Sequence, residues 1–137
     1  MKTMLFENDI KKIDSYKLSQ KAKNIIKNEQ EINTHINKER GGSLCGKVFE
    51  TTAFVVDIIP VETQSLRNDK YTFYDEDLKE SCRKNDLDFL GSYHTHPLSS
   101  PGFPSKIDRE NSKLLKHTLD CVISKDFFCY NGSQNIY

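Results

Sequence analysis

The sequence predicts an α/β (α+β) fold with a single mixed β-sheet flanked by helices. Apolar residues recur at a helical period in the first third of the chain, and short runs rich in β-branched and aromatic residues follow. The predicted order is helix, two strands, helix, strand, helix and further strands, which is typical of helices packed around one sheet. The length of 137 residues, without a linker or repeat, predicts a single domain over residues 1–137.

The first predicted helix begins near Leu18 and ends before Gly41-Gly42. Asp14 or Ser15 is the expected N-cap, because both side chains can accept a hydrogen bond from a free backbone amide. Two consecutive glycines are poor helix formers and mark the expected end. The apolar positions close to a helical period are Leu18, Ala22, Ile25, Ile26, Ile32 and Ile36.

Two strands are predicted next, at residues 43–49 and 54–59, with a turn near Glu50-Thr51. The second run, Phe-Val-Val-Asp-Ile-Ile, is dominated by β-branched residues, and Pro60 fits its end. The polar segment 61–70 is expected to be a loop.

The second half predicts two further helices and the remaining strands. Leu78 and Cys82 should face inward from the first of these helices, and Ile107, Leu114 and Leu115 from the second. The predicted elements are a helix at 74–84, a strand at 87–94, a loop at 97–104, a helix at 105–117, strands at 119–124 and 127–130, a hairpin turn at Asn131-Gly132 and a last strand to Tyr137.

Composition excludes several classes of partner. Lys and Arg total 20, as do Asp and Glu, so the chain lacks the basic excess of nucleic-acid-binding proteins. No apolar run approaches the roughly 20 residues that span a bilayer. The segment Met1 to Asp9 lacks the apolar stretch of a signal peptide, which predicts a cytoplasmic protein. Together, these three observations predict that the chain binds neither nucleic acid nor membrane.

The four cysteines, at positions 45, 82, 121 and 129, form no C-x-x-C pair. In a reducing compartment we expect them to be free thiols, mostly buried in the core. Their spacing does not fit a zinc knuckle.

The segment His94-Thr95-His96-Pro97 carries the main chemical signal. Residues two apart on a strand point to the same face, so the two imidazoles can lie side by side. A catalytic zinc site usually has three protein ligands and one open position, and Asp108, in the first turn of the next helix, can supply the third. Each part has a simpler interpretation: a lone H-x-H is a weak motif, Ser105 to Asp108 is also a capping box, and Gly41-Gly42 can be only a helix stop.

Taken together, these segments resemble the JAMM, or MPN-plus, metallopeptidase family. Its signature is an upstream Glu, then H-[ST]-H-P, then S-x-x-D. Here the parts are Glu39 to Lys47, His94 to Pro97 and Ser105 to Asp108, and Gly91-Ser92-Tyr93 and Tyr71 to Asp75 resemble family segments. The interval between the second histidine and the serine is one residue longer than usual, which an insertion in the loop 98–103 explains.

The resemblance implies a cytidine-deaminase-like, MPN-type sandwich with one Zn²⁺ per chain held by His94, His96 and Asp108. It makes Glu39 the general base and Ser105 the donor of a hydrogen bond to the oxyanion. Glu31 and Glu50 are the nearest competitors of the base. Glu110 is the nearest substitute for the third ligand, although it lies on a different face of its helix.

The implied reaction is hydrolysis of a peptide or isopeptide bond at the C-terminal tail of a ubiquitin-like protein or its conjugate. One alternative is a peptidase that processes a sulfur-carrier protein with the same chemistry. Another, of a different class, is a non-catalytic MPN scaffold module, although such modules usually lose a metal ligand. The resemblance leaves the oligomeric state open.

Overall fold

The computed structural model describes residues 12–36, 39–61, 71–99 and 102–137, with the side chains of 71–74 excepted. Within these residues, seven strands form one sheet in the order β1-β3-β2-β4-β5-β6-β7. The strands are β1 Ser15–Leu18, β2 Gly41–Phe49, β3 Thr52–Pro60, β4 Asp88–Thr95, β5 Asp120–Ile123, β6 Phe127–Asn131 and β7 Gln134–Ile136. The helices are α2 Gln20–His35, α3 Tyr71–Arg83 and α4 Lys106–Leu114.

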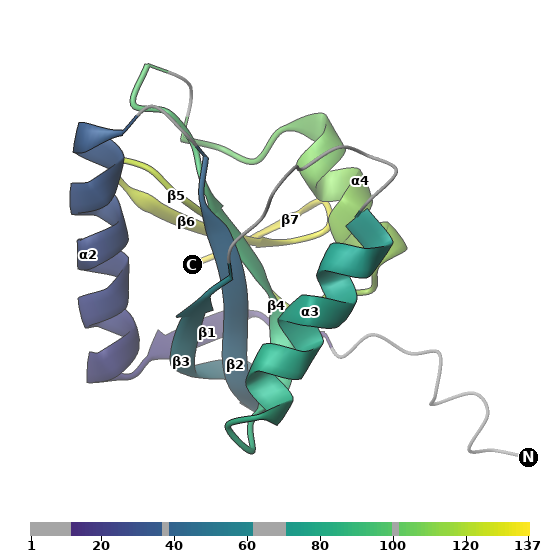
Figure 1. Cartoon of the computed structure of the whole chain (residues 1–137). Coiled ribbons are helices and arrows are strands. Elements are labelled where there is room, and N and C mark those ends of the chain that lie inside the picture. Colours follow the sequence, from purple (N-terminus) through teal and green to yellow (C-terminus); the bar gives the residue numbers. More distant parts are fainter. Residues whose placement is uncertain (1–11, 37–38, 62–70, 100–101) are drawn as a thin grey trace, which may run out of the picture.

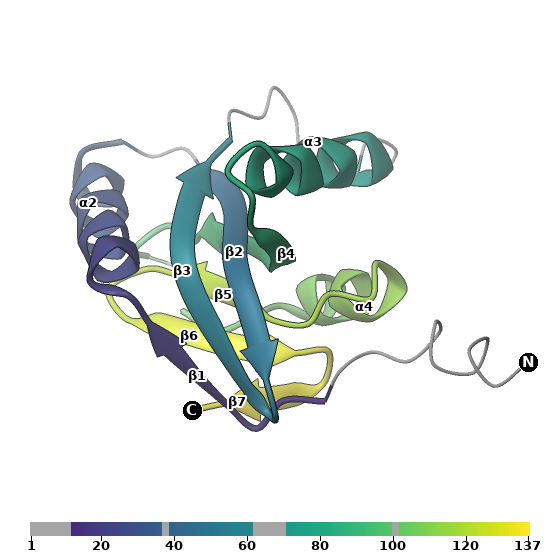
Figure 2. The same ribbon diagram turned by 90° about the horizontal axis from the view of Figure 1, so that it is seen from below.

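The sheet lies between two layers of helices. Helix α2 covers one face, whereas α3 and α4 lie on the other (Figures 1 and 2). The pairs β1–β3 and β4–β5 are parallel, and the remaining neighbours are antiparallel. The predicted class, a single mixed sheet flanked by helices, is therefore confirmed.

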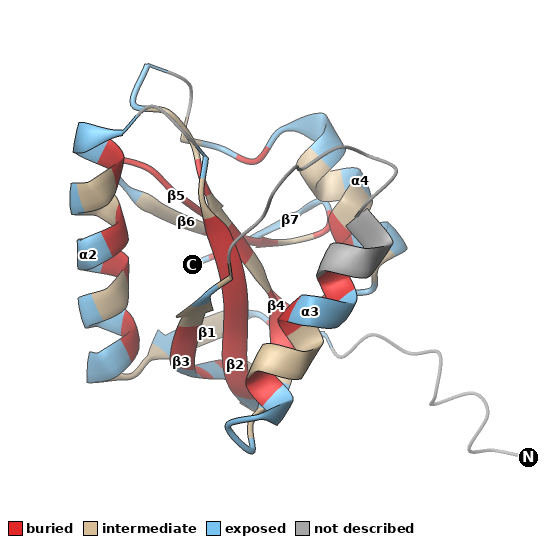
Figure 3. Ribbon diagram, viewed as in Figure 1, coloured by how far each residue is buried: buried red, intermediate tan, exposed pale blue. Residues whose placement is uncertain are grey.

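The core is centred on β2, whose buried residues form a nearly continuous run, with buried positions facing it from α2 and α3 (Figure 3). Leu44 on β2 and Tyr93 on β4 are 0% and 1% exposed. Leu78 and Cys82 are also buried, which confirms the predicted inward face of α3.

The N-terminal boundary of α2 differs from the prediction. Residues Ser15–Leu18 form β1, which pairs in parallel with β3, and the helix begins only afterwards. Its N-cap is Ser19, whose Oγ accepts a hydrogen bond from Ala22 N at 3.0 Å, and not Asp14 or Ser15. A partner strand 37 residues away therefore overrides the helical pattern that seemed to start at Leu18.

Gly41-Gly42 is part of a strand and does not end the helix. Helix α2 stops at His35, and the two glycines open β2, where they pair with His94 and Tyr93 of β4. A Cβ on Gly42 would meet the carbonyl oxygen of Ile59 and lie 2.7 Å from the Tyr93 ring. Close packing of neighbouring strands beside the site therefore requires glycine at position 42.

Helix α4 is shorter than predicted, and its apolar residues do not all face inward. Ile107 and Leu114 are 54% and 77% exposed, and only Leu115, just past the helix, is half-buried. The helix ends at Leu114, and Lys116 follows with a φ of 57°. The buried residue of α4 is the small polar Ser112, so the apolar positions did not indicate the buried face of this helix.

The expectation of free thiols is wrong in this structure, although all four cysteines are buried as predicted. The structure joins Cys45 to Cys82 and Cys121 to Cys129. The first pair links β2 to the inner face of α3, with the Cα atoms 5.5 Å apart, and the second links opposed residues of β5 and β6. The first pairing joins segments 37 residues apart, and the second joins neighbouring strands 8 residues apart, and a spacing rule for C-x-x-C motifs detects neither.

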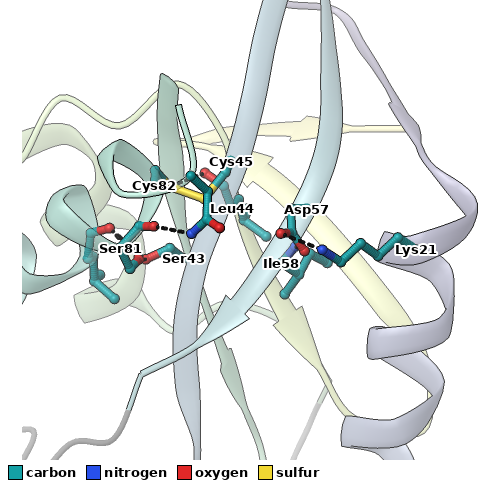
Figure 4. The surroundings of a disulfide bond; sticks show 10 residues. Lys21, Ser43, Leu44, Cys45, Asp57, Ile58, Ser81 and Cys82 are labelled. Carbon is teal, nitrogen blue, oxygen red and sulfur yellow. Dashed lines mark hydrogen bonds and ion pairs between the residues drawn. A yellow bond between two sulfur atoms is a disulfide. The ribbon is translucent and has the colours of Figure 1, made fainter. Parts of the chain in front are cut away.

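Polar contacts hold a helix to each face of the sheet near the first disulfide (Figure 4). The Ser43 hydroxyl donates to the carbonyl oxygen of Leu78 at 2.8 Å, which fastens α3 to β2. On the opposite face, Lys21 Nζ of α2 lies 3.0 Å from Asp57 Oδ2 of β3.

Two further boundaries agree with the prediction, whereas α3 begins at Tyr71 and not at residue 74. Pro60 ends β3, and the hairpin between β6 and β7 turns at Gly132, whose φ of 55° favours glycine. Of the predicted loop at 61–70, all but Val61 lies outside the described residues. No helix in the described part is long and apolar enough to cross a membrane.

Candidate metal centre

The two histidines of the H-x-H motif lie side by side at the end of β4. The Nε2 atoms of His94 and His96 are 2.9 Å apart, and the ring centroids are 4.7 Å apart. Thr95 between them is fully buried, as strand alternation predicts. The strand ends at Thr95, and Pro97 follows the second histidine.

Asp108 approaches the same point from the first turn of α4. Its Oδ2 atom lies 3.2 Å from His94 Nε2 and 3.4 Å from His96 Nε2. Burial by itself raises the pKa of this carboxyl, but hydrogen bonds from the two histidines and from the Ser105 amide outweigh it and leave the pKa well below its usual value. Asp108 therefore presents a carboxylate to the two rings.

The capping box and the candidate site use the same residues. Ser105 N donates to Asp108 Oδ2 at 2.8 Å, and Asp108 N donates to Ser105 Oγ at 3.0 Å. These reciprocal bonds satisfy two free amides at the helix start and also restrict the Asp108 side chain. The capping interpretation therefore does not compete with the metal-site interpretation, because it explains how the carboxylate is oriented.

The donor atoms have the spacing that one small cation requires. The three atoms from His94, His96 and Asp108 form a triangle with sides of 2.9, 3.2 and 3.4 Å. Ligands about 2.0–2.2 Å from a tetrahedral zinc lie roughly 3.3–3.5 Å from one another. Two neutral imidazoles and a carboxylate are also a common donor set for catalytic zinc, so these residues fit the ion.

Glu39 lies beside the histidines, in the segment that leads into β2. One of its carboxylate oxygens lies within 4.8 Å of a ring nitrogen of both His94 and His96. The residue is exposed and lies four positions beyond the end of α2. The prediction that the helix extends to Glu39 is therefore wrong. The pairing of Gly41 with His94 brings Glu39 to this place. Its competitors Glu31 and Glu50 are not in this group of metal-binding atoms.

The donor triangle opens into a cavity of about 780 Å³. Glu39, Ser105 and the three donors are among the residues that line it, and Ser105 is exposed to the solvent. The cavity passes between α3 and α4, where apolar side chains form its wall: Leu78, Phe103, Ile107, Leu115 and Tyr130. Glu110, the alternative third ligand, is exposed and does not line it.

Three buried residues that line this cavity form a charged cluster that sequence analysis missed: Asp75, His117 and Asp120. His117 Nε2 and Nδ1 each lie 2.7 Å from a carboxylate oxygen, of Asp75 and Asp120 respectively. Burial alone would lower the pKa of His117, but attraction to Asp120 and the hydrogen bonds that the ring donates to both carboxylates raise it to about 10. Burial raises the pKa of the Asp120 carboxyl, but attraction to His117 and the hydrogen bond from its ring outweigh burial and leave that pKa lowered. A positively charged His117 therefore lies between the two carboxyl groups.

The sequence gives only a weak signal for this charged cluster. His117 and Asp120 are three residues apart, but Asp75 is 42 residues from His117 and lies on α3. For the inner face of α2 the sequence gives a clearer signal, because its buried residues follow a helical spacing: Ala22, Ile26, Glu29 and Asn33. Two of these four residues are polar.

Most of the chain is similar to a known family of proteins. Residues 29–130 match the family described as "Prokaryotic homologs of the JAB domain". Among curated proteins, none matches the chain significantly.

Solved structures share the fold at low sequence identity. Protein DSY2949 from Desulfitobacterium hafniense has a TM-score of 0.56 and 17% identity, over 88% of this chain and 87% of its own. AF2198, a JAB1/MPN domain protein from Archaeoglobus fulgidus, has a TM-score of 0.54 and 15% identity, over 90% of this chain and 93% of its own. At such identities these two structures support the fold alone.

Proposed function

The chain belongs to the family of prokaryotic JAB-domain homologues, and from this premise we propose that it is a zinc-dependent peptidase or isopeptidase. The observation that carries the proposal is the triangle of donor atoms with Glu39 beside it. The family includes zinc hydrolases, and a module that served only as a scaffold would have no need of a complete donor set.

In the proposed mechanism His94, His96 and Asp108 hold the ion. When bound, Zn²⁺ polarises the scissile carbonyl and lowers the pKa of water toward about 7. The Glu39 carboxylate accepts the proton of the attacking water and then gives it to the leaving amine. The Ser105 hydroxyl donates a hydrogen bond to the oxygen of the substrate carbonyl as negative charge develops there.

The proposed substrate is the C-terminal tail of a ubiquitin-like protein or its conjugate, and the alternative is the tail of a sulfur-carrier protein. The residues of the candidate centre line a cavity that residues of α3 and α4 also line, together with Phe103. We propose that an extended tail of small residues lies in this cavity. The two substrates require the same chemistry and differ only in the protein that carries the tail.

Purified chain should bind close to one zinc, and Asp108→Asn should weaken that binding by at least about 10²-fold. The amide can still accept the bond from Ser105 N, so α4 should keep its cap while the centre loses its anionic ligand. Metal analysis and competition with a chelator measure both quantities. Glu110→Gln, an exposed carboxylate on the same helix, should bind zinc like the wild type.

Hydrolysis is tested with fusions that extend the tail of ubiquitin or of a sulfur-carrier protein past its terminal glycine. Mass spectrometry of the zinc-loaded reaction should show cleavage at that glycine, and a chelator should stop it. Zinc-loaded chain that leaves every such tail intact would contradict the proposed function. Cleavage of only one class of fusion would decide between the two substrates.

Ser105→Gly is expected to lower kcat by about 10²-fold or more, because one hydrogen bond to the oxyanion is lost. Glycine is tolerated at an N-cap at a cost of only a few tenths of a kcal/mol, so α4 should persist. Ser105→Thr, which keeps a hydroxyl, is the matched control and should retain most activity. Equal rates for the glycine and threonine variants would limit Ser105 to helix capping.

A further inference from the structure

The inner face of α2 buries a charged residue next to the candidate centre. Glu29 is 1% exposed, and Arg40 contacts both of its carboxylate oxygens: Nε lies 3.3 and 3.2 Å from them, and Nη2 lies 3.0 Å from Oε2. The Tyr93 hydroxyl, itself buried, donates to Oε1 at 2.7 Å. A buried carboxylate is unfavourable unless it is paired, and the forked guanidinium gives this pair a defined direction.

Arg40 is also held through its backbone. Its amide donates to Thr95 Oγ1 at 2.8 Å, and its carbonyl accepts from Thr95 N at 2.8 Å. Thr95 separates the two candidate metal ligands on β4. Side chain and backbone of Arg40 therefore tie α2 to the strand that carries the histidines.

A second contact of α2 reaches the same strand end. Asn33, one helical turn after Glu29, donates from Nδ2 to the carbonyl oxygen of His96 at 2.9 Å. The inner face of α2 thus contacts both sides of the centre, at Arg40 next to the candidate base and at the second histidine.

The side chain of Glu39 has few restraints of its own. Within the described part of the chain, no hydrogen bond holds its side chain, which is exposed. Its position therefore follows from its backbone, and the next residue along the chain is Arg40.

We propose that Glu29 is a positioning residue, which acts through Arg40 to hold Glu39 at the distance from the metal centre that proton transfer requires. This inference rests on the proposed function, in which Glu39 is the base. A carboxylate and a guanidinium joined by a forked contact fix a segment more strictly than an apolar contact of similar size. Misplacement of a reacting group by about 1 Å can cost on the order of 10²-fold in rate.

The first test is Glu29→Gln, which keeps the size of the side chain and removes its charge. We expect kcat to fall by at least about tenfold, with KM within about twofold of the wild type and one zinc still bound. The matched control is Asp57→Asn, since Asp57 is another buried carboxylate that pairs α2 with the sheet, through Lys21 and away from the centre. Asp57→Asn should keep the wild-type kcat even if its melting temperature falls by as much as that of Glu29→Gln.

The double variant E29Q/R40Q separates positioning from stability. Arg40→Gln alone leaves the Glu29 charge buried without its partner, whereas the double variant leaves no unpaired charge and should regain stability. Under the proposal kcat stays low in the double variant, because the forked contact is still missing. Recovery of kcat together with stability would overturn the proposal.

Hydrogen exchange followed by NMR gives a readout that needs neither substrate nor metal. In Glu29→Gln the amides of Arg40 and Thr95 should exchange faster, while that of Thr118, which donates to Leu90 O on another part of the sheet, should not change. Unchanged protection of Arg40 and Thr95 would overturn the role of Glu29. Because no reaction is involved, this result stands even if no ubiquitin-like tail is cleaved and the proposed function fails.

Discussion

Replacing Glu39 by glutamine is expected to lower kcat by about 10²–10⁴-fold while one zinc remains bound per chain. Glutamine has nearly the same shape but cannot accept the proton of the attacking water. The residue is exposed and lies outside the triangle of donor atoms, so neither the fold nor the ion should depend on its charge.

Single-turnover cleavage of the tail fusions and metal analysis of the same sample measure the two quantities together. Glu31→Gln is the matched control, because Glu31 is an exposed glutamate of α2 outside the metal-binding group, and it should cleave at the wild-type rate. Full activity in Glu39→Gln would rule out Glu39 as the general base. Loss of zinc together with activity would make it a ligand instead.

Replacing His117 by asparagine is expected to cost about 3–5 kcal/mol of the free energy of unfolding. The variant leaves Asp75 and Asp120, which are 4% and 2% exposed, without the cation between them. For a chain of this length the loss corresponds to a fall in melting temperature of roughly 10–20 °C. His35→Gln, at an exposed histidine in the last turn of α2, is the control and should change stability little.

The His117 contribution should also depend on pH in a defined direction. Its pKa is raised from 6.5 to about 10 by folding, so its stabilisation is complete below pH 6.5 and is lost as the pH rises toward 10. Urea unfolding of wild type and variant at pH 6, 8 and 10 should show a difference in free energy that shrinks at each step. A difference that stays constant across this range would mean that His117 is not charged in the fold.

Much of the candidate centre could be predicted because it depends on local geometry. Strand alternation brings His94 and His96 to one face whatever the rest of the chain does. The capping box likewise sets Asp108 from its own helix turn. These rules act within a few residues, so they are visible in a single sequence.

The errors occurred where a distant partner decided the outcome. Pairing with β3 turned Ser15–Leu18 into a strand, and packing of β2 against α3 placed Cys45 opposite Cys82. The positions of Ile107 and Leu114 on α4 follow from which helix face meets the sheet, which apolar spacing alone does not reveal in a helix with only a short apolar stripe.

By itself, the sequence determined the class of fold, the H-x-H pair and the capped aspartate, because each follows from a period or a turn of a few residues. Only the tertiary structure decided that Glu39 reaches the histidines, that Glu29 holds Arg40 and that His117 joins two carboxylates. A buried charge is strongly unfavourable unless an opposite charge pairs with it, and the packing of the whole chain decides whether a residue of another element supplies that charge.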